Sequence, residues 1–206
     1  MKIINNSNYK VGGSDMPARA KVTKEMIIDA AFEVARNEGA ENINARTVSQ
    51  KLGCSTQPVL YYFERIEDVR IAAHKKGREF HINYVTNLSG KYERPMLEMG
   101  MRYIQFAVKE KNLFRFLFHS NYYTSGCLSD WLTEEYLGSV FSILKIQAGV
   151  DTQQAYCIFS QIFLVTHGIA SLLANNAMIY DEAYCIKALS NAYFGVMNLM
   201  KEGNLL

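Results

Sequence analysis

The sequence predicts an all-α fold of nine helices, arranged as a three-helix N-terminal domain and a larger C-terminal helical bundle. Apolar residues recur at helical spacing along most of the 206 residues, and the alternation typical of half-buried strands is absent. The chain has only three prolines, the last of which is Pro95, so nothing interrupts long helices in its second half.

The limits of each helix follow from N-cap residues and from glycines that end a helix in the left-handed conformation. The expected N-caps are Thr23, Asn44, Ser55, Asp151 and Asp181. The nine expected helices cover residues 24–38, 45–52, 56–62, 66–88, 95–110, 112–119, 129–148, 152–175 and 182–203. The polar residues 1–15 are expected to form a disordered leader, with Met16 as an alternative start. The first domain then spans residues 16–65 and the second residues 66–206.

Gly53 separates two short helices, which is the arrangement of a helix-turn-helix motif. In such a motif the second helix presents its N-terminal residues to the major groove of DNA. Residues 42–63 include Arg46 and Lys51 but no Asp or Glu, and the arm at residues 17–24 is also basic and free of acids. In a chain of net charge +2, two local basic segments favour contact with DNA phosphates. The alternative is a three-helix packing unit with ordinary surface charge.

The first domain resembles the DNA-binding module of the tetracycline-repressor (TetR/AcrR) family. The matching segments are Thr23-Lys-Glu-Met-Ile-Ile-Asp-Ala-Ala-Phe32, Asn37-Glu-Gly39, Ile43-Asn-Ala-Arg-Thr-Val-Ser-Gln-Lys-Leu-Gly53 and Ser55-Thr-Gln-Pro-Val-Leu-Tyr-Tyr-Phe63. This resemblance implies the TetR-like architecture and a homodimeric regulator that binds a near-palindromic operator in double-stranded DNA. It also implies release from the operator by a small-molecule effector, here expected to be apolar or aromatic.

The resemblance implies base contacts from the start of the third helix, where Gln57 could hydrogen-bond adenine. The family's usual phosphate-binding tyrosine is Leu60 here, so the two tyrosines that follow are expected to contact the backbone. Where the family often has a lysine this chain has Ile66, and Arg65 is expected to substitute for it. The predicted DNA-binding residues are Arg46, Thr47, Ser55, Thr56, Gln57, Pro58, Tyr61 and Tyr62.

Most aromatic residues lie from Phe80 onward, so the second domain could hold an apolar cavity for the effector. The predicted lining residues are Tyr103, Phe106, Phe114, Phe118, Trp131, Phe163 and His167. The alternative is that these side chains only fill the core. Val165-Thr-His-Gly-Ile-Ala-Ser-Leu172 resembles the WHG type of TetR C-terminal domain, with Thr166 in place of the usual tryptophan. His167 is expected either to line the cavity or to satisfy a buried hydrogen bond.

The last two helices are expected to form the homodimer interface through small residues at helical spacing, which let helices approach closely. These residues are Gly168, Ser171, Ala174, Ala188, Ala192 and Gly195. Residues 152–180 carry no Asp, Glu, Lys or Arg, but their interrupting Gln, His and Asn residues argue against a membrane span.

Other classes of protein receive little support. The four cysteines form no C-x-x-C pair, so we expect reduced thiols in a cytoplasmic protein with no metal and no cofactor. The usual nucleophile, zinc, phosphate and dinucleotide motifs are missing, which argues against an enzyme. His74 and His81 share a helix face and are interpreted as surface or packing residues. A helix-turn-helix protein that acts through partner proteins, without an effector, remains an alternative.

Overall fold

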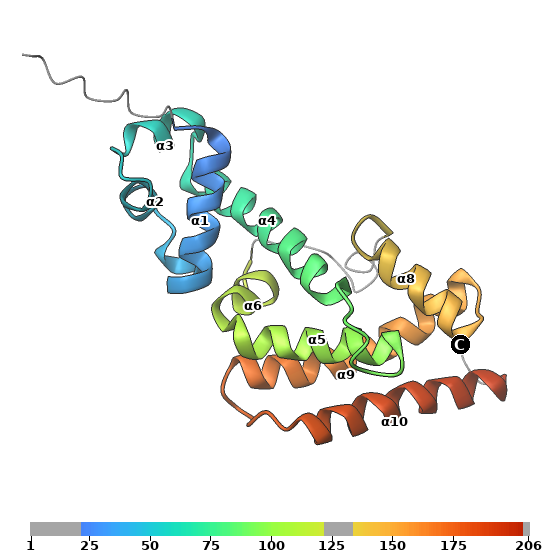
Figure 1. The fold of residues 1–206 in the computed structure, drawn as a ribbon. Helices are drawn as coiled ribbons and strands as arrows, with labels where there is room; N and C mark the ends of the chain where they lie inside the picture. The colour runs from blue at the N-terminus through green and yellow to red at the C-terminus, as the bar shows by residue number, and fades with distance from the viewer. Residues whose placement is uncertain (1–21, 122–133, 204–206) are drawn as a thin grey trace, which may run out of the picture.

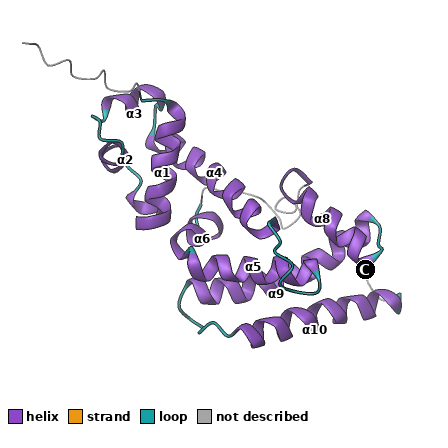
Figure 2. Cartoon of the chain, viewed as in Figure 1, coloured by secondary structure: helices purple, strands orange, loops and turns teal. Residues whose placement is uncertain are grey.

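The computed structural model describes residues 22–121 and 134–203, and within these ranges the protein has nine α-helices and no β-strand. The helices are α1 (Lys24–Glu38), α2 (Ala45–Lys51), α3 (Gln57–Tyr62), α4 (Ile66–Thr86), α5 (Pro95–Lys109), α6 (Lys111–Phe118), α8 (Glu134–Ala148), α9 (Thr152–Ala174) and α10 (Glu182–Lys201). A short 3₁₀ turn at Ala40–Asn42, which the sequence analysis did not predict, follows α1. Figure 2 shows the predicted all-helical character.

The helices α1, α2 and α3 form one end of the molecule (Figure 1). The apolar stripe of α1 is buried, and Val48 of α2 and Val59 of α3 pack into the same core. Gly53 forms the turn between α2 and α3 with φ of +64°, a conformation that L side chains rarely adopt. The two short helices are therefore held in place by burial on one side and by a glycine turn between them.

The long helix α4 runs from this end of the molecule to the C-terminal bundle (Figure 1). It packs along α1 and then reaches α5, α6 and α8. Near its start, the Arg70 guanidinium donates to the Ile43 carbonyl oxygen, with Nη2 at 2.9 Å. At Gly77, an added Cβ would lie 3.0 Å from Leu117 Cδ2, so the missing side chain lets α6 approach α4 closely.

In the C-terminal bundle α5 and α9 lie side by side, with α8 against both of them and α10 along α9 (Figure 1). By length and hydropathy α9 is the single described helix that could cross a membrane. It packs against α5, α6, α8 and α10, and its buried side includes Ile158, Ile162 and Leu173. Burial in the bundle accounts for the apolar residues on that side.

Four of the five predicted N-caps are confirmed. Side-chain oxygens of Thr23, Asn44, Asp151 and Asp181 each accept a backbone N–H in the first turn of the helix that follows. The fifth prediction was wrong: Thr56, not Ser55, occupies the N-cap of α3, and it makes no side-chain capping bond. The predicted helix at residues 129–148 is described only from Glu134. The predicted leader at residues 1–15 lies outside the described residues.

Candidate functional site

The helix α3 exposes one face to solvent and is anchored by the other. Val59 and the following Phe63 are buried, whereas Thr56, Gln57 and Tyr61 are exposed. Tyr61 keeps 82% of its surface, an unusual exposure for so large a ring, and its ring contacts that of Tyr62 edge to face at 5.1 Å. The anchored helix thus presents polar and phenolic groups outward.

The helix α2 begins with a capping box. Asn44 Oδ1 accepts the backbone N–H groups of Arg46 and Thr47, both at 3.0 Å. The Thr47 hydroxyl accepts the Asn44 backbone N–H and donates to the Asn42 carbonyl at 2.6 Å. Its one proton is therefore used within the protein, and Thr47 acts here as a positioning residue.

Two basic side chains near these helices differ in their partners. Arg46 is exposed and has no ion pair among residues 22–121 and 134–203. Arg65, by contrast, pairs with Asp68, with Nη2 3.0 Å from Oδ1. The hydrogen bond to Asp68, together with the charge of that carboxylate, raises the pKa of Arg65, so Arg65 stays charged and paired. Of these two side chains, Arg46 is the one available to a phosphate.

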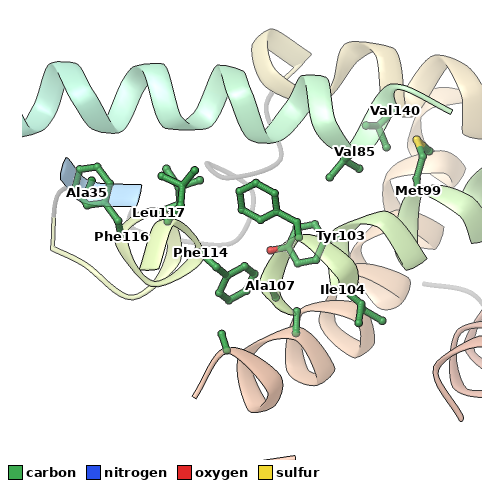
Figure 3. Close-up of a cluster of buried hydrophobic side chains, with 14 of the residues drawn as sticks. Ala35, Val85, Met99, Tyr103, Ile104, Ala107, Phe114, Phe116, Leu117 and Val140 are labelled. Carbon is green, nitrogen blue, oxygen red and sulfur yellow. The ribbon is translucent and has the colours of Figure 1, made fainter. Parts of the chain in front are cut away.

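A cavity of about 90 Å³ lies in the C-terminal bundle. Figure 3 shows Val85 of α4, Met99 and Tyr103 of α5, and Val140 of α8 around this region. Its lining comes from α4, α5, α6, α8 and α9: Arg78, His81, Ile82, Val85, Met96, Met99, Gly100, Tyr103, Leu117, Phe118, Leu137, Val140, Phe159, Ile162, Phe163 and Thr166. Such an apolar, aromatic wall with a few polar groups is typical of a small-molecule site.

No protein-family model matches the chain, and no curated protein matches it in sequence. Solved structures do match. The crystal structure of the multidrug-binding protein EbrR complexed with ethidium gives a TM-score of 0.57 at 19% identity, over 82% of this chain and 96% of that chain. The structure of a single-residue variant of TetR from Acinetobacter baumannii AYE, in complex with minocycline, gives 0.51 at 15% identity, over 88% and 96%.

The chain has the TetR-type fold. The likeness extends over nearly the whole length of both solved chains, so it includes α1–α3 and the C-terminal bundle together. At these identities the likeness concerns the fold, and the predicted TetR-like architecture is confirmed at that level.

Within the TetR-type fold, three of the predicted cavity residues are found in the lining: Tyr103, Phe118 and Phe163. Phe106 and Phe114 are not in the lining and are completely buried in the core. Trp131 lies outside the described residues. Phe106 and Phe114 therefore fill the core, as the alternative interpretation proposed.

His167 makes hydrogen bonds and does not line the cavity. Its Nδ1 lies 2.8 Å from the Tyr103 hydroxyl, and its Nε2 lies 3.3 Å from the Ser171 hydroxyl. Burial lowers the pKa of His167 to about 4, so the ring is neutral at pH 7. Of the two roles left open by the sequence, the buried hydrogen bond is the one found.

His81 lines the cavity, a position that the sequence analysis did not predict for it. It is only 6% exposed, so the packing role is the one found of the two that the sequence analysis left open, surface or packing. Its ring contacts those of Tyr103, Phe106 and Phe118 at centroid distances of 5.0, 4.7 and 5.1 Å. Burial, with a smaller contribution from the Arg78 charge, lowers its pKa to about 3. A histidine at an inward-facing position of α4 was the available signal.

Proposed function

We propose that the protein is a dimeric DNA-binding transcriptional regulator, and specifically a repressor released from a near-palindromic operator by a small apolar or aromatic effector. One observation carries this proposal: the exposed face of α3, with Gln57 and Tyr61 outward, belongs to a chain whose second domain holds an apolar cavity. The similar solved structures, one with ethidium and one with minocycline, support a small-molecule partner.

The DNA contacts divide into two kinds. Thr56, Gln57 and Pro58 at the start of α3 would meet base edges in the major groove, with a bidentate amide on adenine as the natural role of Gln57. Arg46, Ser55, Tyr61 and Tyr62 would contact phosphates, which position the helix without specifying sequence. Thr47 would support Arg46 through the capping box of α2.

The dimer would form through α9 and α10. Six large apolar side chains on these two helices remain exposed in the single chain: Leu164, Val165, Leu172, Tyr184, Phe194 and Leu199. Exposed apolar groups gathered on neighbouring helices are typical of a protein interface. Gly168 and Gly195 are exposed as well, but Ala174 is fully buried within the chain and does not belong to the small-residue face predicted for it.

Release of the operator DNA by the effector would depend on α4 and α6. The cavity is lined by residues of both helices, and both pack against α1. Because Arg70 of α4 also binds the Ile43 carbonyl just before α2, a shift of α4 would move the helix-turn-helix. In a dimer such a shift changes the separation of the two recognition helices, and so the affinity for DNA.

The test is binding of the purified chain to operator fragments selected from random DNA, at fixed ionic strength. We expect a two-fold symmetric site, and we expect the double variant Gln57→Ala and Tyr61→Ala to lose specific binding while its helix content and dimer state are unchanged. Tyr61→Phe keeps the ring but removes the hydroxyl. It therefore distinguishes a role of the hydroxyl in binding phosphate from a role of the ring in packing. Undiminished operator affinity in the double variant would contradict the assignment of α3.

A further inference from the structure

One polar atom in the wall of the cavity has no partner. His81 Nε2 is buried and makes no hydrogen bond in the part of the chain that the structure describes. Unpaired buried polar atoms are rare in folded proteins, because burial removes their hydration without compensation. His81 lines the cavity, so a molecule bound there can supply the missing partner.

The other polar groups among the described lining residues are already engaged within the protein. The Tyr103 hydroxyl lies 2.8 Å from His167 Nδ1, and the Thr166 hydroxyl donates to a backbone carbonyl oxygen one turn earlier in α9, at 2.7 Å. Arg78 also has an interaction within the protein. Of the described lining residues, His81 is therefore the one with a buried atom that needs a partner.

The protonation of His81 determines which group can pair with Nε2. Burial lowers the pKa of His81 to about 3, so the ring is neutral at pH 7 and carries a single N–H. Nε2 donates a hydrogen bond in one tautomer and accepts one in the other. A hydroxyl group both donates and accepts, so it pairs with either tautomer, whereas an ether or carbonyl oxygen pairs only with the N–H form. A hydroxyl is therefore the neutral group that suits this nitrogen best.

The surroundings of His81 favour an aromatic ring. The His81 ring lies edge to face with the rings of Tyr103 and Phe118. Phe159 and Phe163 of α9 stack in the same wall, with their centroids 5.8 Å apart. Contacts between aromatic rings stabilise beyond what the buried area alone provides. A ring in the cavity would thus find aromatic neighbours from α5, α6 and α9.

The volume of the cavity limits the ligand to a single ring. It is about 90 Å³, below the roughly 150 Å³ of an engineered cavity that holds a benzene molecule. Met96 and Met99 lie in the wall, and methionine side chains are flexible enough to move aside for one ring with a small substituent.

We propose that the cavity binds a simple phenol, a monocyclic aromatic molecule whose hydroxyl group forms a hydrogen bond with His81 Nε2. The ring of the phenol packs among Phe118, Phe159 and Phe163. This inference names the chemical class of the effector, and to that extent it rests on the proposed function.

The test compares p-cresol, toluene and 4-methylanisole, which carry a hydroxyl, a hydrogen and a methoxy group at the same position of the ring. Calorimetric titration of the full chain at pH 7 should show p-cresol binding about five-fold more tightly than toluene, the factor given by one net hydrogen bond. The ether should bind more weakly than p-cresol, because its oxygen pairs with only one tautomer of His81.

Variants assign the preference to His81. His81→Phe keeps a ring but removes both nitrogens. It should abolish the preference for p-cresol and change the affinity for toluene by less than about two-fold, since it conserves the shape of the wall. His81→Gln keeps a polar group at this position and should retain part of the preference. Thermal melting of each variant verifies that it is folded.

His74→Phe is the matched control, because it is the same substitution at a second buried histidine of α4. His74 is not a lining residue, and its Nε2 already has a partner in the Leu117 carbonyl oxygen. The variant should therefore keep the preference for p-cresol over toluene.

Equal affinities for p-cresol and toluene, an ether that binds as tightly as p-cresol, or no binding of any probe would overturn the inference. So would a preference for p-cresol that persists in His81→Phe or disappears in His74→Phe. If the chain binds operator DNA but does not prefer p-cresol, this inference alone fails. If it binds p-cresol with this preference but binds no DNA, the proposed function fails and the ligand class stands.

Discussion

At the scale of single residues, burial determines the protonation of the histidines in the C-terminal bundle. His81 has a pKa lowered to about 3, mainly by burial, and His167 has one lowered to about 4 for the same reason. Burial also lowers the pKa of His74, whose Nε2 lies 3.3 Å from the Leu117 carbonyl oxygen. All three rings are therefore neutral in the folded protein at pH 7.

We expect the free energy of unfolding to decrease as the pH falls from about 6.5 toward 4, because the unfolded chain then takes up protons that the folded chain does not. Above about pH 6.5 neither state binds these protons, and the stabilisation is complete. Each fully buried histidine contributes up to about 1.4 kcal/mol per pH unit in this window. Urea denaturation at several pH values between neutral and mildly acidic measures the slope.

The variant His81→Phe should show a smaller slope than the wild-type chain, since it lacks one of the groups that titrate. His119→Phe serves as the comparison, because burial also lowers the pKa of His119 but its side chain is exposed at the surface. A slope for His81→Phe equal to that of the wild type would show that His81 is protonated in both states alike.

At the scale of helices, the sequence analysis succeeded where the signal is local. Thr23, Asn44, Asp151 and Asp181 were predicted as N-caps because capping needs only the side chain and the next three residues. It failed at α3, where Ser55 is the better cap by residue type but the adjacent Thr56 occupies the N-cap position.

The cavity residues could be predicted only in part, because residue type and spacing do not distinguish a wall from a core. Phe114 and Phe118 are one turn apart on α6, yet Phe118 lines the cavity and Phe114 is completely buried. Their separation depends on how α6 is rotated against α4 and α9, which is a long-range property. The same holds for His81, whose role depends on α5 and α6 closing around it.

The junction between α5 and α6 is tied to α1 by an ion pair. Arg36 Nε and Nη2 donate to the two carboxylate oxygens of Glu110 at 2.8 and 2.5 Å, and Asn112 Nδ2 lies 3.4 Å from the Arg36 carbonyl. Glu110→Gln keeps the shape but removes the charge. We expect it to lower the free energy of unfolding by about 1.5–3 kcal/mol, the value of hydrogen bonds to charged groups, as measured by urea denaturation.

A second acid beside Arg36 provides the control for this prediction. Glu33 lies 3.8 Å from Arg36 Nη1 across one turn of α1, and its side chain is more exposed than that of Glu110. Glu33→Gln should therefore cost no more than about 0.5 kcal/mol. Equal effects of the two substitutions would mean that the contact between α1 and α6 adds nothing beyond surface charge.

At the scale of the whole molecule, the proposed function requires two copies of the chain. Leu164 on α9 is 53% exposed, and a carboxylate there would be buried unpaired in the proposed interface. Leu164→Asp should give a monomer in analytical ultracentrifugation. Operator affinity should fall at least about a hundred-fold, because the two recognition helices no longer bind as a linked pair.

Ile71→Asp is a matched control, since Ile71 on α4 is 52% exposed and lies outside α9 and α10. It should remain a dimer. A dimeric Leu164→Asp variant would place the interface elsewhere on the surface. Sequence alone predicts an interface on α9 and α10 from their small residues, but it does not indicate which of these residues stay uncovered: Ala174 is small and yet belongs to the interior of the single chain.

Because Gly77 has no side chain, α6 contacts the backbone of α4 directly at this point. Leu117 both lines the cavity and rests on α4 at a point where no side chain intervenes. A ligand that displaces Leu117 would push it against the backbone of α4. Backbone atoms cannot relieve such a contact by changing rotamer, as a side chain can. A molecule that occupies the cavity would thus act directly on α4, the helix that connects the C-terminal bundle to the helix-turn-helix.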